Sequence, residues 1–96
     1  MIKADGPIAI WDQTKDGLMT IAVDKAVIFD THSQNYGDSV VVRIQSGEKL
    51  YQARNRVADE CDKIFALVGS DDVVIKFRRV MSKNGREYLD VDIAED

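Results

Sequence analysis

The sequence predicts one mainly β domain with a single long helix, and three patterns carry this prediction. Residues 73–93 (VVIKFRRVMSKNGREYLDVDI) contain two runs in which apolar and charged residues alternate around a KNG turn. Residues 18–30 form a long run rich in β-branched and aromatic side chains. Residues 55–68 instead repeat apolar residues every three or four positions, which is the period of an amphipathic helix.

The final hairpin has a register that its own pattern decides. A two-residue turn at Asn84-Gly85 would mix charged and apolar side chains on both faces of the strand pair. A three-residue loop with Gly85 in the left-handed conformation instead gives one apolar and one charged face. The pairs that it predicts are Phe77 with Val91, Ile75 with Ile93, Lys76 with Asp92, and Arg78 with Asp90. We therefore predict the three-residue loop.

The chain before residue 31 combines a short N-terminal segment with one long strand. Residues 8–11 form either a short strand or an extended arm, and a KDG turn follows. Trp11 is expected to be a core anchor, with a platform for stacking bases as the alternative. The run from 18 to 30 is apolar on both of its faces, which is typical of a strand that curves between two sheets. One of these faces is expected to hold Ile21, Val23, Val27 and Phe29.

A second hairpin precedes the helix. After a loop dense in turn residues, residues 39–45 and 49–53 form two strands. The pattern leaves the register of this hairpin open, so that Tyr51 faces either inward beside Val42 or outward beside Arg43.

The helix is expected over residues 55–68, with Asn55 as N-cap and Gly69 just past its end. One apolar stripe should face the core, and its members are Val57, Cys61, Ile64, Phe65 and Val68.

Composition limits the classes of protein that fit. The chain has 96 residues, enough for one small core, and a single cysteine, so an internal disulfide is excluded. It contains neither an apolar run of membrane-spanning length nor a signal-peptide pattern, and we expect a soluble, cytoplasmic protein. The net charge of −4 argues mildly against strong binding of a polyanion. Residues 73–86 include basic but no acidic residues, and residues 87–96 include acidic but no basic ones. The two runs should therefore neutralise each other across the hairpin.

The predicted order of elements is that of the OB-fold, a five-stranded Greek-key barrel with one helix between its third and fourth strands. Residues 17–96 would form this domain, and residues 1–16 an N-terminal arm or short extra strand. Gly17-Leu18, Tyr36-Gly37 and the segment SKNGREY at 82–88 resemble single-stranded-DNA-binding OB domains, over roughly residues 17–93. The resemblance implies a strand bound across the second and third strands of the barrel, flanked by two loops.

Single-strand binding uses basic residues for the backbone and aromatic rings for the bases. The candidate binding residues are Tyr36, Arg43, Lys49, Tyr51, Arg54, Arg79, Lys83, Arg86 and Tyr88. Cross-strand neutralisation would leave Arg79, Lys83 and Arg86 partly unpaired near the hairpin tip.

An enzyme is not expected, because His32 and Cys61 are the only residues of their types and give no catalytic or zinc-site spacing. We expect neither a cofactor nor a metal. The favoured function is non-catalytic, largely sequence-independent binding of single-stranded DNA, with RNA and homo-oligomerisation left open. The alternative is a protein-interaction or assembly subunit of a replication or phage complex that does not contact nucleic acid.

Overall fold

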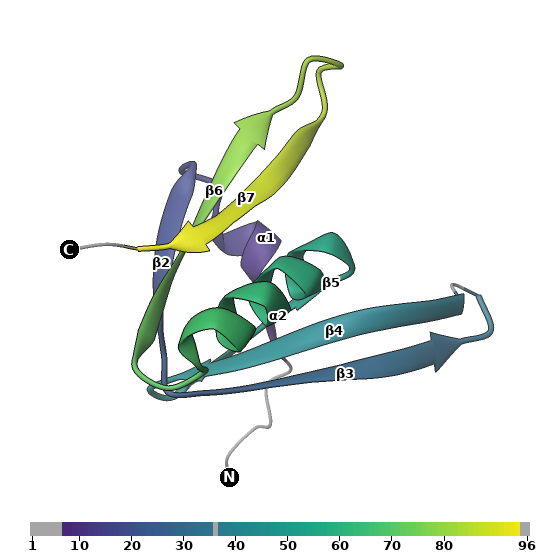
Figure 1. Ribbon diagram of the computed structural model, residues 1–96. Helices are drawn as coiled ribbons and strands as arrows, with labels where there is room; N and C mark the ends of the chain where they lie inside the picture. The colour runs from purple at the N-terminus through teal and green to yellow at the C-terminus, as the bar shows by residue number, and fades with distance from the viewer. Residues whose placement is uncertain (1–6, 36, 95–96) are drawn as a thin grey trace, which may run out of the picture.

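The computed structural model describes residues 7–35 and 37–94 of the chain. The elements are β1 (Ile8–Ala9), α1 (Ile10–Gln13), β2 (Leu18–Val23), β3 (Lys25–Ser33), β4 (Gly37–Ser46), β5 (Lys49–Arg54), α2 (Arg56–Val68), β6 (Val73–Met81) and β7 (Glu87–Ile93). The strands form two sheets, one ordered β1-β5-β4-β3 and one ordered β2-β6-β7. The prediction of a mainly β domain is confirmed, and Figure 1 shows α2 lying in the angle between the two sheets.

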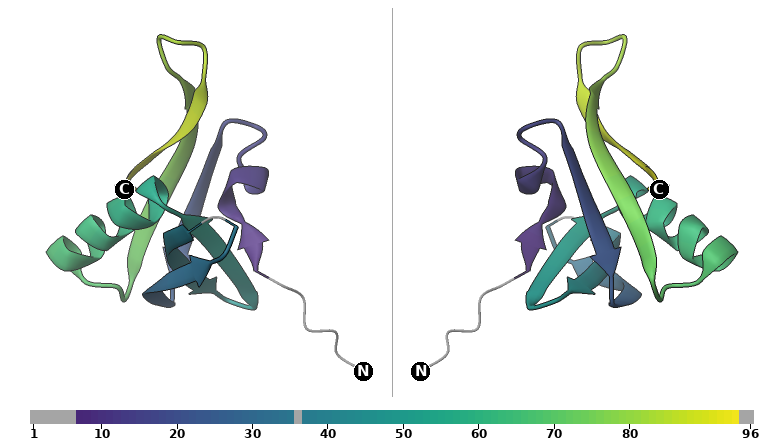
Figure 2. Two further views of the ribbon diagram at one scale, coloured as in Figure 1. Left: turned by 90° about the vertical axis from the view of Figure 1, so that its right-hand side faces the viewer. Right: turned by 90° about the vertical axis from the view of Figure 1, so that its left-hand side faces the viewer.

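The two sheets do not close into one barrel within the described residues. No strand pairing there joins β5 to β7. The edge of β5 is taken instead by β1, which runs parallel to it with Ile8 opposite Tyr51 and Ala9 opposite Gln52. Residues 7–35 and 37–94 contain seven strands rather than the five expected of the barrel, because the long strand is divided into β2 and β3 and the N-terminal segment forms the short extra strand β1. Figure 2 shows α2 on one flank of the molecule and β1 with α1 on the other.

The division of the long strand at Asp24 changes which side chains face the core. Strand β2 pairs with β6 and β3 pairs with β4, so the prediction that this run serves two sheets is confirmed. Val23 is 2% exposed, whereas Val27 is 48% exposed and Ile28 packs against the core. The prediction that Val27 and Phe29 share a face with Val23 is therefore wrong. Asp24 belongs to neither strand, so one residue is added between the two alternating patterns and the inward positions change from odd to even.

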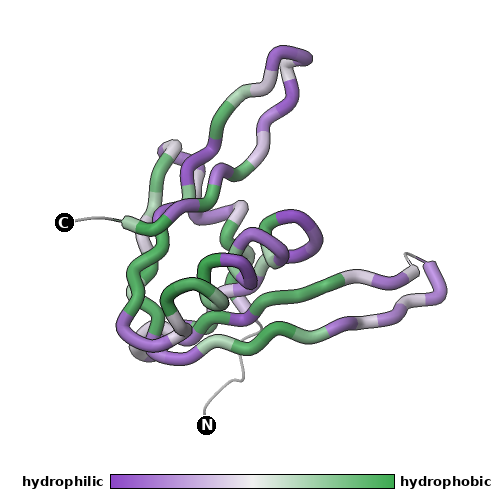
Figure 3. The backbone as a smooth tube through the Cα atoms, viewed as in Figure 1, coloured by the Kyte–Doolittle hydropathy of each residue, from purple (hydrophilic) through white to green (hydrophobic). Residues whose placement is uncertain are grey.

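The β6–β7 hairpin has the predicted register. Phe77 lies opposite Val91, and all four predicted pairs are present. The Ser82 N–H donates to the Arg86 carbonyl at 2.8 Å, which closes a three-residue loop with Gly85 at a φ of +81°. The apolar face packs into the core, with Phe77 fully buried. Figure 3 shows the hydrophobic segments gathered where the two sheets and α2 meet.

Helix α2 contacts β4, β5 and β7 and buries Ala58, Cys61 and Ile64. Val68 was expected on the same stripe but is 51% exposed, because it lies in the last turn, beyond the buried part of the helix. Asn55 occupies the N-cap position, yet its side chain makes no capping hydrogen bond and its backbone has a φ of +58°. The helix ends as predicted, with the Gly69 N–H donating to the Phe65 carbonyl at 2.8 Å.

The N-terminal segment enters the core through Ile10, which is fully buried, and not through Trp11, which is 39% exposed. The expectation of Trp11 as a core anchor is therefore wrong. Helix α1 turns the indole outward, while the side chain before it takes the inward position. In the described part of the chain, neither helix is both long and apolar enough to cross a membrane.

Candidate nucleic-acid interface

One face of the four-stranded sheet points away from the core and carries no carboxylate from the described strands. The register places most of its side chains in four cross-strand rows, which together we call the outer face. These rows are Lys25–Gln45–Leu50, Val27–Arg43–Gln52, Phe29–Val41–Arg54 and Thr31–Ser39. These four rows therefore hold basic, polar and apolar side chains but no acidic ones, although the net charge of the chain is −4.

Arg43 is held at the centre of the outer face. Its Nε–H donates to Oε1 of Gln52 at 2.9 Å, and its guanidinium carbon lies 5.1 Å from the centre of the Phe29 ring. A guanidinium has five N–H donors, and the contact with Gln52 uses one of them. The others can donate to a ligand, while the guanidinium covers part of the half-buried Phe29 ring beside them.

The basic residues of the outer face have no acidic partner among residues 7–35 and 37–94. The ion pairs there join Lys63 to Glu60 and Arg78 to Asp90, and His32 to Asp38 when that imidazole is protonated. Asp24, at the rim of the sheet, instead accepts a hydrogen bond from the Gly47 N–H at 2.6 Å. The charges of Lys25, Arg43 and Arg54 are consequently not neutralised by a neighbouring side chain.

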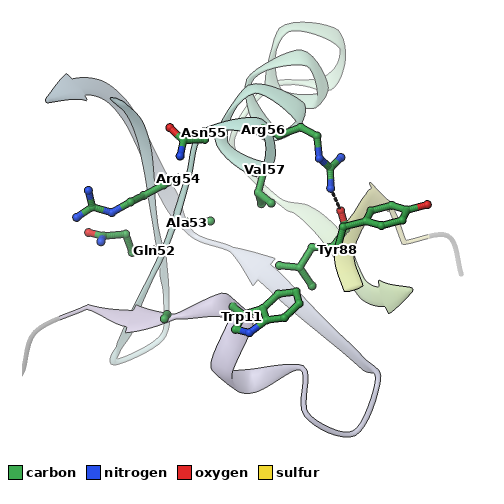
Figure 4. Close-up of a pocket in the computed structure, with 10 residues that line it drawn as sticks. Trp11, Gln52, Ala53, Arg54, Asn55, Arg56, Val57 and Tyr88 are labelled. Carbon is green, nitrogen blue, oxygen red and sulfur yellow. Dashed lines mark hydrogen bonds between the residues drawn. The ribbon is translucent and has the colours of Figure 1, made fainter. Parts of the chain in front are cut away.

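A hollow of about 420 Å³ lies between β5 and β7, which belong to different sheets, and we call it the β5–β7 cleft. Its lining residues are Ala9, Trp11, Gln52, Ala53, Arg54, Asn55, Arg56, Val57, Tyr88 and Leu89. Figure 4 shows Trp11 and Val57 beside the hollow, while Gln52 and Arg54 point away from it. Arg56 donates to the Leu89 carbonyl and lies over the Tyr88 ring, 5.2 Å from its centre.

The residues expected to bind nucleic acid do not form one surface. Arg43 and Arg54 lie on the outer face, and Tyr88 borders the cleft. Tyr51 lies opposite Ile44 and is 9% exposed, so the structure selects the inward alternative and leaves little of the ring for stacking.

Three further candidates lie at turns. Lys49 begins β5 and is exposed. Lys83 and Arg86 are at the tip of the β6–β7 hairpin, which projects away from the four-stranded sheet in Figure 1. Tyr36 lies outside the described residues.

The sequence suggested that Arg79 is a partly unpaired cation near the hairpin tip. The structure instead gives it partners in the N-terminal segment. Its guanidinium carbon lies 3.8 Å from the centre of the Trp11 ring, and its Nη2 donates to the Trp11 carbonyl. Its Nε–H also donates to the Thr14 hydroxyl at 3.3 Å. The N-terminal segment therefore supplies the partner of this charge.

Sequence reasoning missed Lys25 and Phe29 on the outer face and Arg56 at the cleft, and it weighed Trp11 as a stacking surface but favoured a place in the core. Lys25 and Phe29 were missed because the alternation of apolar residues gives no sign that the inward positions change from odd to even at Asp24. An exposed Trp11 becomes recognisable only when its contact with Arg79 is known, and the two residues are 68 positions apart.

The cysteine and histidine do not form a reactive pair. Cys61 is fully buried in α2, and His32 is exposed on β3, where its Nδ1 lies 2.6 Å from Oδ1 of Asp38. Burial raises the pKa of the Cys61 thiol to about 12, and the nearby Glu60 adds to the rise. The thiol is therefore protonated at neutral pH and is a poor nucleophile.

Comparison with protein-family models, curated proteins and solved structures finds no match to this chain. The fold and the candidate site define a mainly β domain of two sheets, with an acid-free basic face on one sheet and an aromatic-walled cleft beside it.

Proposed function

We propose that this chain is a non-catalytic single-stranded-DNA-binding protein that holds its ligand on the outer face. One observation carries the proposal. Lys25, Arg43 and Arg54 share a surface with Phe29 and with exposed apolar side chains, and no carboxylate lies among them. Affinity for single strands comes from this combination of cations and stacking surfaces.

We also propose that the fold is an opened variant of the OB-fold. The order of elements supports this: a long divided strand (β2 and β3), then β4, β5, α2, β6 and β7. Strand β1 would stand in the place along β5 that β7 takes in a closed barrel of this type. The outer face would then correspond to the strands on which OB-folds bind single strands.

The binding mode follows from the chemistry of the face. Lys25, Arg43 and Arg54 would contact phosphates, and one base would stack on Phe29. Such contacts recognise the backbone and the flat face of any base, so little sequence preference is expected. Three phosphate contacts give a slope of about −2 in a plot of log affinity against log salt concentration.

Fluorescence anisotropy with a labelled oligothymidylate of about 15 nucleotides tests the proposal at salt concentrations of about 50 and 200 mM. We expect moderate binding that weakens about twentyfold between these concentrations. Arg43→Glu should weaken binding by about tenfold or more, because it places a carboxylate beside the bound backbone.

Arg78→Glu is the matched control, since it changes the net charge equally but lies on the other sheet, beside Asp90. Equal losses in the two variants, or no binding at the lower salt concentration, would contradict the proposal. The double variant Lys83→Glu with Arg86→Glu shows whether the hairpin tip contributes to the same site.

The second candidate function is that of a protein-interaction subunit. Leu67 and Val68 favour it, because they are 80% and 51% exposed at the end of α2 and offer an apolar contact. An acidic chain that fails to bind oligonucleotides even at low salt would fit this function better. Cross-linking of the purified chain would then show whether it contacts a second copy of itself.

A further inference from the structure

We propose that the β5–β7 cleft receives one unpaired nucleobase, stacked on Trp11, from a strand that lies on the outer face. This inference rests on the proposed function and adds to it a second, separate subsite. It is carried by four features of the cleft: an anchored indole, apolar walls, a rim without carboxylates, and direct continuity with the outer face.

The indole is held in place before any ligand arrives. Trp11 is 39% exposed, and Arg79 both lies over its ring and donates to its carbonyl. The hydroxyl of Thr14, a fully buried residue, donates to the same carbonyl at 2.8 Å. A stacking surface that is already ordered costs little further conformational entropy on binding.

Arg79 does not line the cleft, whereas Trp11 does. The indole therefore presents to the cleft a surface that Arg79 leaves uncovered. The walls beside it are the apolar side chains of Ala53, Val57 and Leu89. A hollow of about 420 Å³ lies within the usual range for sites that enclose a small planar group.

The rim of the cleft suits the phosphate on either side of an inserted base. Arg54 and Arg56 both contribute to the lining, although the Arg54 side chain points away from the hollow, and no Asp or Glu is among the described residues that line it. Neither arginine makes an ion pair within residues 7–35 and 37–94. Asn55, between them, carries a side-chain amide that can both donate to and accept from a base edge.

The cleft continues directly from the outer face. Gln52 and Arg54 belong to the cross-strand rows of that face, and both also line the cleft. A strand that follows Arg43 toward Arg54 therefore reaches the mouth of the cleft at the edge of β5. The aromatic side chain of a peptide would fit the apolar walls too, but the arginines at the rim make no ion pair with a described carboxylate and therefore favour a polyanion.

The test uses the wild-type chain, because Trp11 is its only tryptophan and reports on the cleft alone. Oligothymidylate is compared with a strand of equal length and charge that lacks bases, and both anisotropy and tryptophan emission are recorded. We expect oligothymidylate to quench the emission and to protect the indole from acrylamide. The base-free strand should bind more weakly and leave the emission unchanged.

Trp11→Ala should then weaken binding of oligothymidylate by about tenfold, the usual effect of removing one stacking ring, while Trp11→Phe keeps most of the affinity. Circular dichroism shows whether both variants are folded, and the wild-type quenching experiment does not depend on them. Binding by anisotropy without any change in Trp11 emission would overturn the cleft subsite but keep the proposed function. No anisotropy change at all would overturn both. Quenching by a tyrosine-containing peptide but not by oligothymidylate would assign the cleft to a peptide instead.

Discussion

Arg79 of β6 stacks on Trp11 of α1, with its guanidinium carbon 3.8 Å from the centre of the indole ring. This contact joins the three-stranded sheet to the N-terminal segment, whose strand β1 belongs to the other sheet. Arg79 lies opposite Leu89 on the inward side of the hairpin, just past Phe77, the last buried apolar residue of β6. Arg79 therefore stabilises the packing of the N-terminal segment against the three-stranded sheet.

Arg79→Ala should lower the free energy of unfolding by about 1–3 kcal/mol, because it removes a cation–π contact and two charge-assisted hydrogen bonds. Urea denaturation measures this loss. Tryptophan emission of the folded variant should also shift, since the indole loses the cation above it.

The neighbouring substitution Arg78→Ala is the matched control. Arg78 pairs with Asp90 at 3.7 Å, but both side chains are more than half exposed, and such pairs contribute about 0–1 kcal/mol. Equal destabilisation by the two variants would show that the contact with Trp11 contributes nothing specific.

Asn55→Gly should stabilise the protein by about 1 kcal/mol. Asn55 has a φ of +58° and a ψ of −121°, a conformation that glycine adopts without strain, and its side chain makes no capping bond that would be lost. Thermal denaturation should show a higher midpoint for Asn55→Gly and a lower one for Asn55→Ala. A lower midpoint for the glycine variant would mean that the side chain stabilises the start of α2 in another way.

Gly85→Ala should destabilise the β6–β7 hairpin by about 1–2 kcal/mol, which is the cost of a left-handed conformation for a residue with a Cβ. The φ of Gly85 is +81°, and an added Cβ would have no atom within 4 Å, so the cost comes from the backbone alone. Gly85→Asn should cost less, because asparagine tolerates this conformation better. Urea denaturation of both variants checks the order, and equal losses would indicate a cause other than φ.

Burial of Cys61 should make stability fall in alkaline solution. The pKa of its thiol is raised from 9.0 to about 12 in the folded protein, chiefly by burial. Above pH 9 the unfolded chain releases this proton and the folded chain keeps it, so unfolding becomes more favourable as the pH rises toward 12. The contribution of this one group to the slope is about 1.4 kcal/mol per pH unit.

Urea denaturation at several alkaline pH values, with Cys61→Ala as the reference, isolates this contribution from that of lysines and tyrosines. The variant is expected to be less stable at neutral pH, because it leaves a small cavity, but to lose stability less steeply above pH 9. Identical slopes in the two proteins would show that the thiol has an ordinary pKa.

Local patterns predicted the hairpin and the helix well, because each depends on residues close together in the chain. The pairing of Phe77 with Val91 follows from alternation and from the three residues of the loop. The same reasoning placed Val27 and Phe29 on the wrong face, because alternation was continued through Asp24 as if one strand ran without a break. The outer face, with Phe29 beside Arg43, was therefore not visible from the pattern.

The amino-acid sequence by itself determined which segments are extended, the register of the last hairpin and the buried stripe of α2 around Cys61, since periodicity and turn chemistry act within a few residues. The tertiary structure decided which strands share a sheet, that the two sheets do not close on each other within the described residues, and that Arg79 meets Trp11. These features depend on contacts between residues far apart in the chain, and no local period encodes the free energy of such contacts.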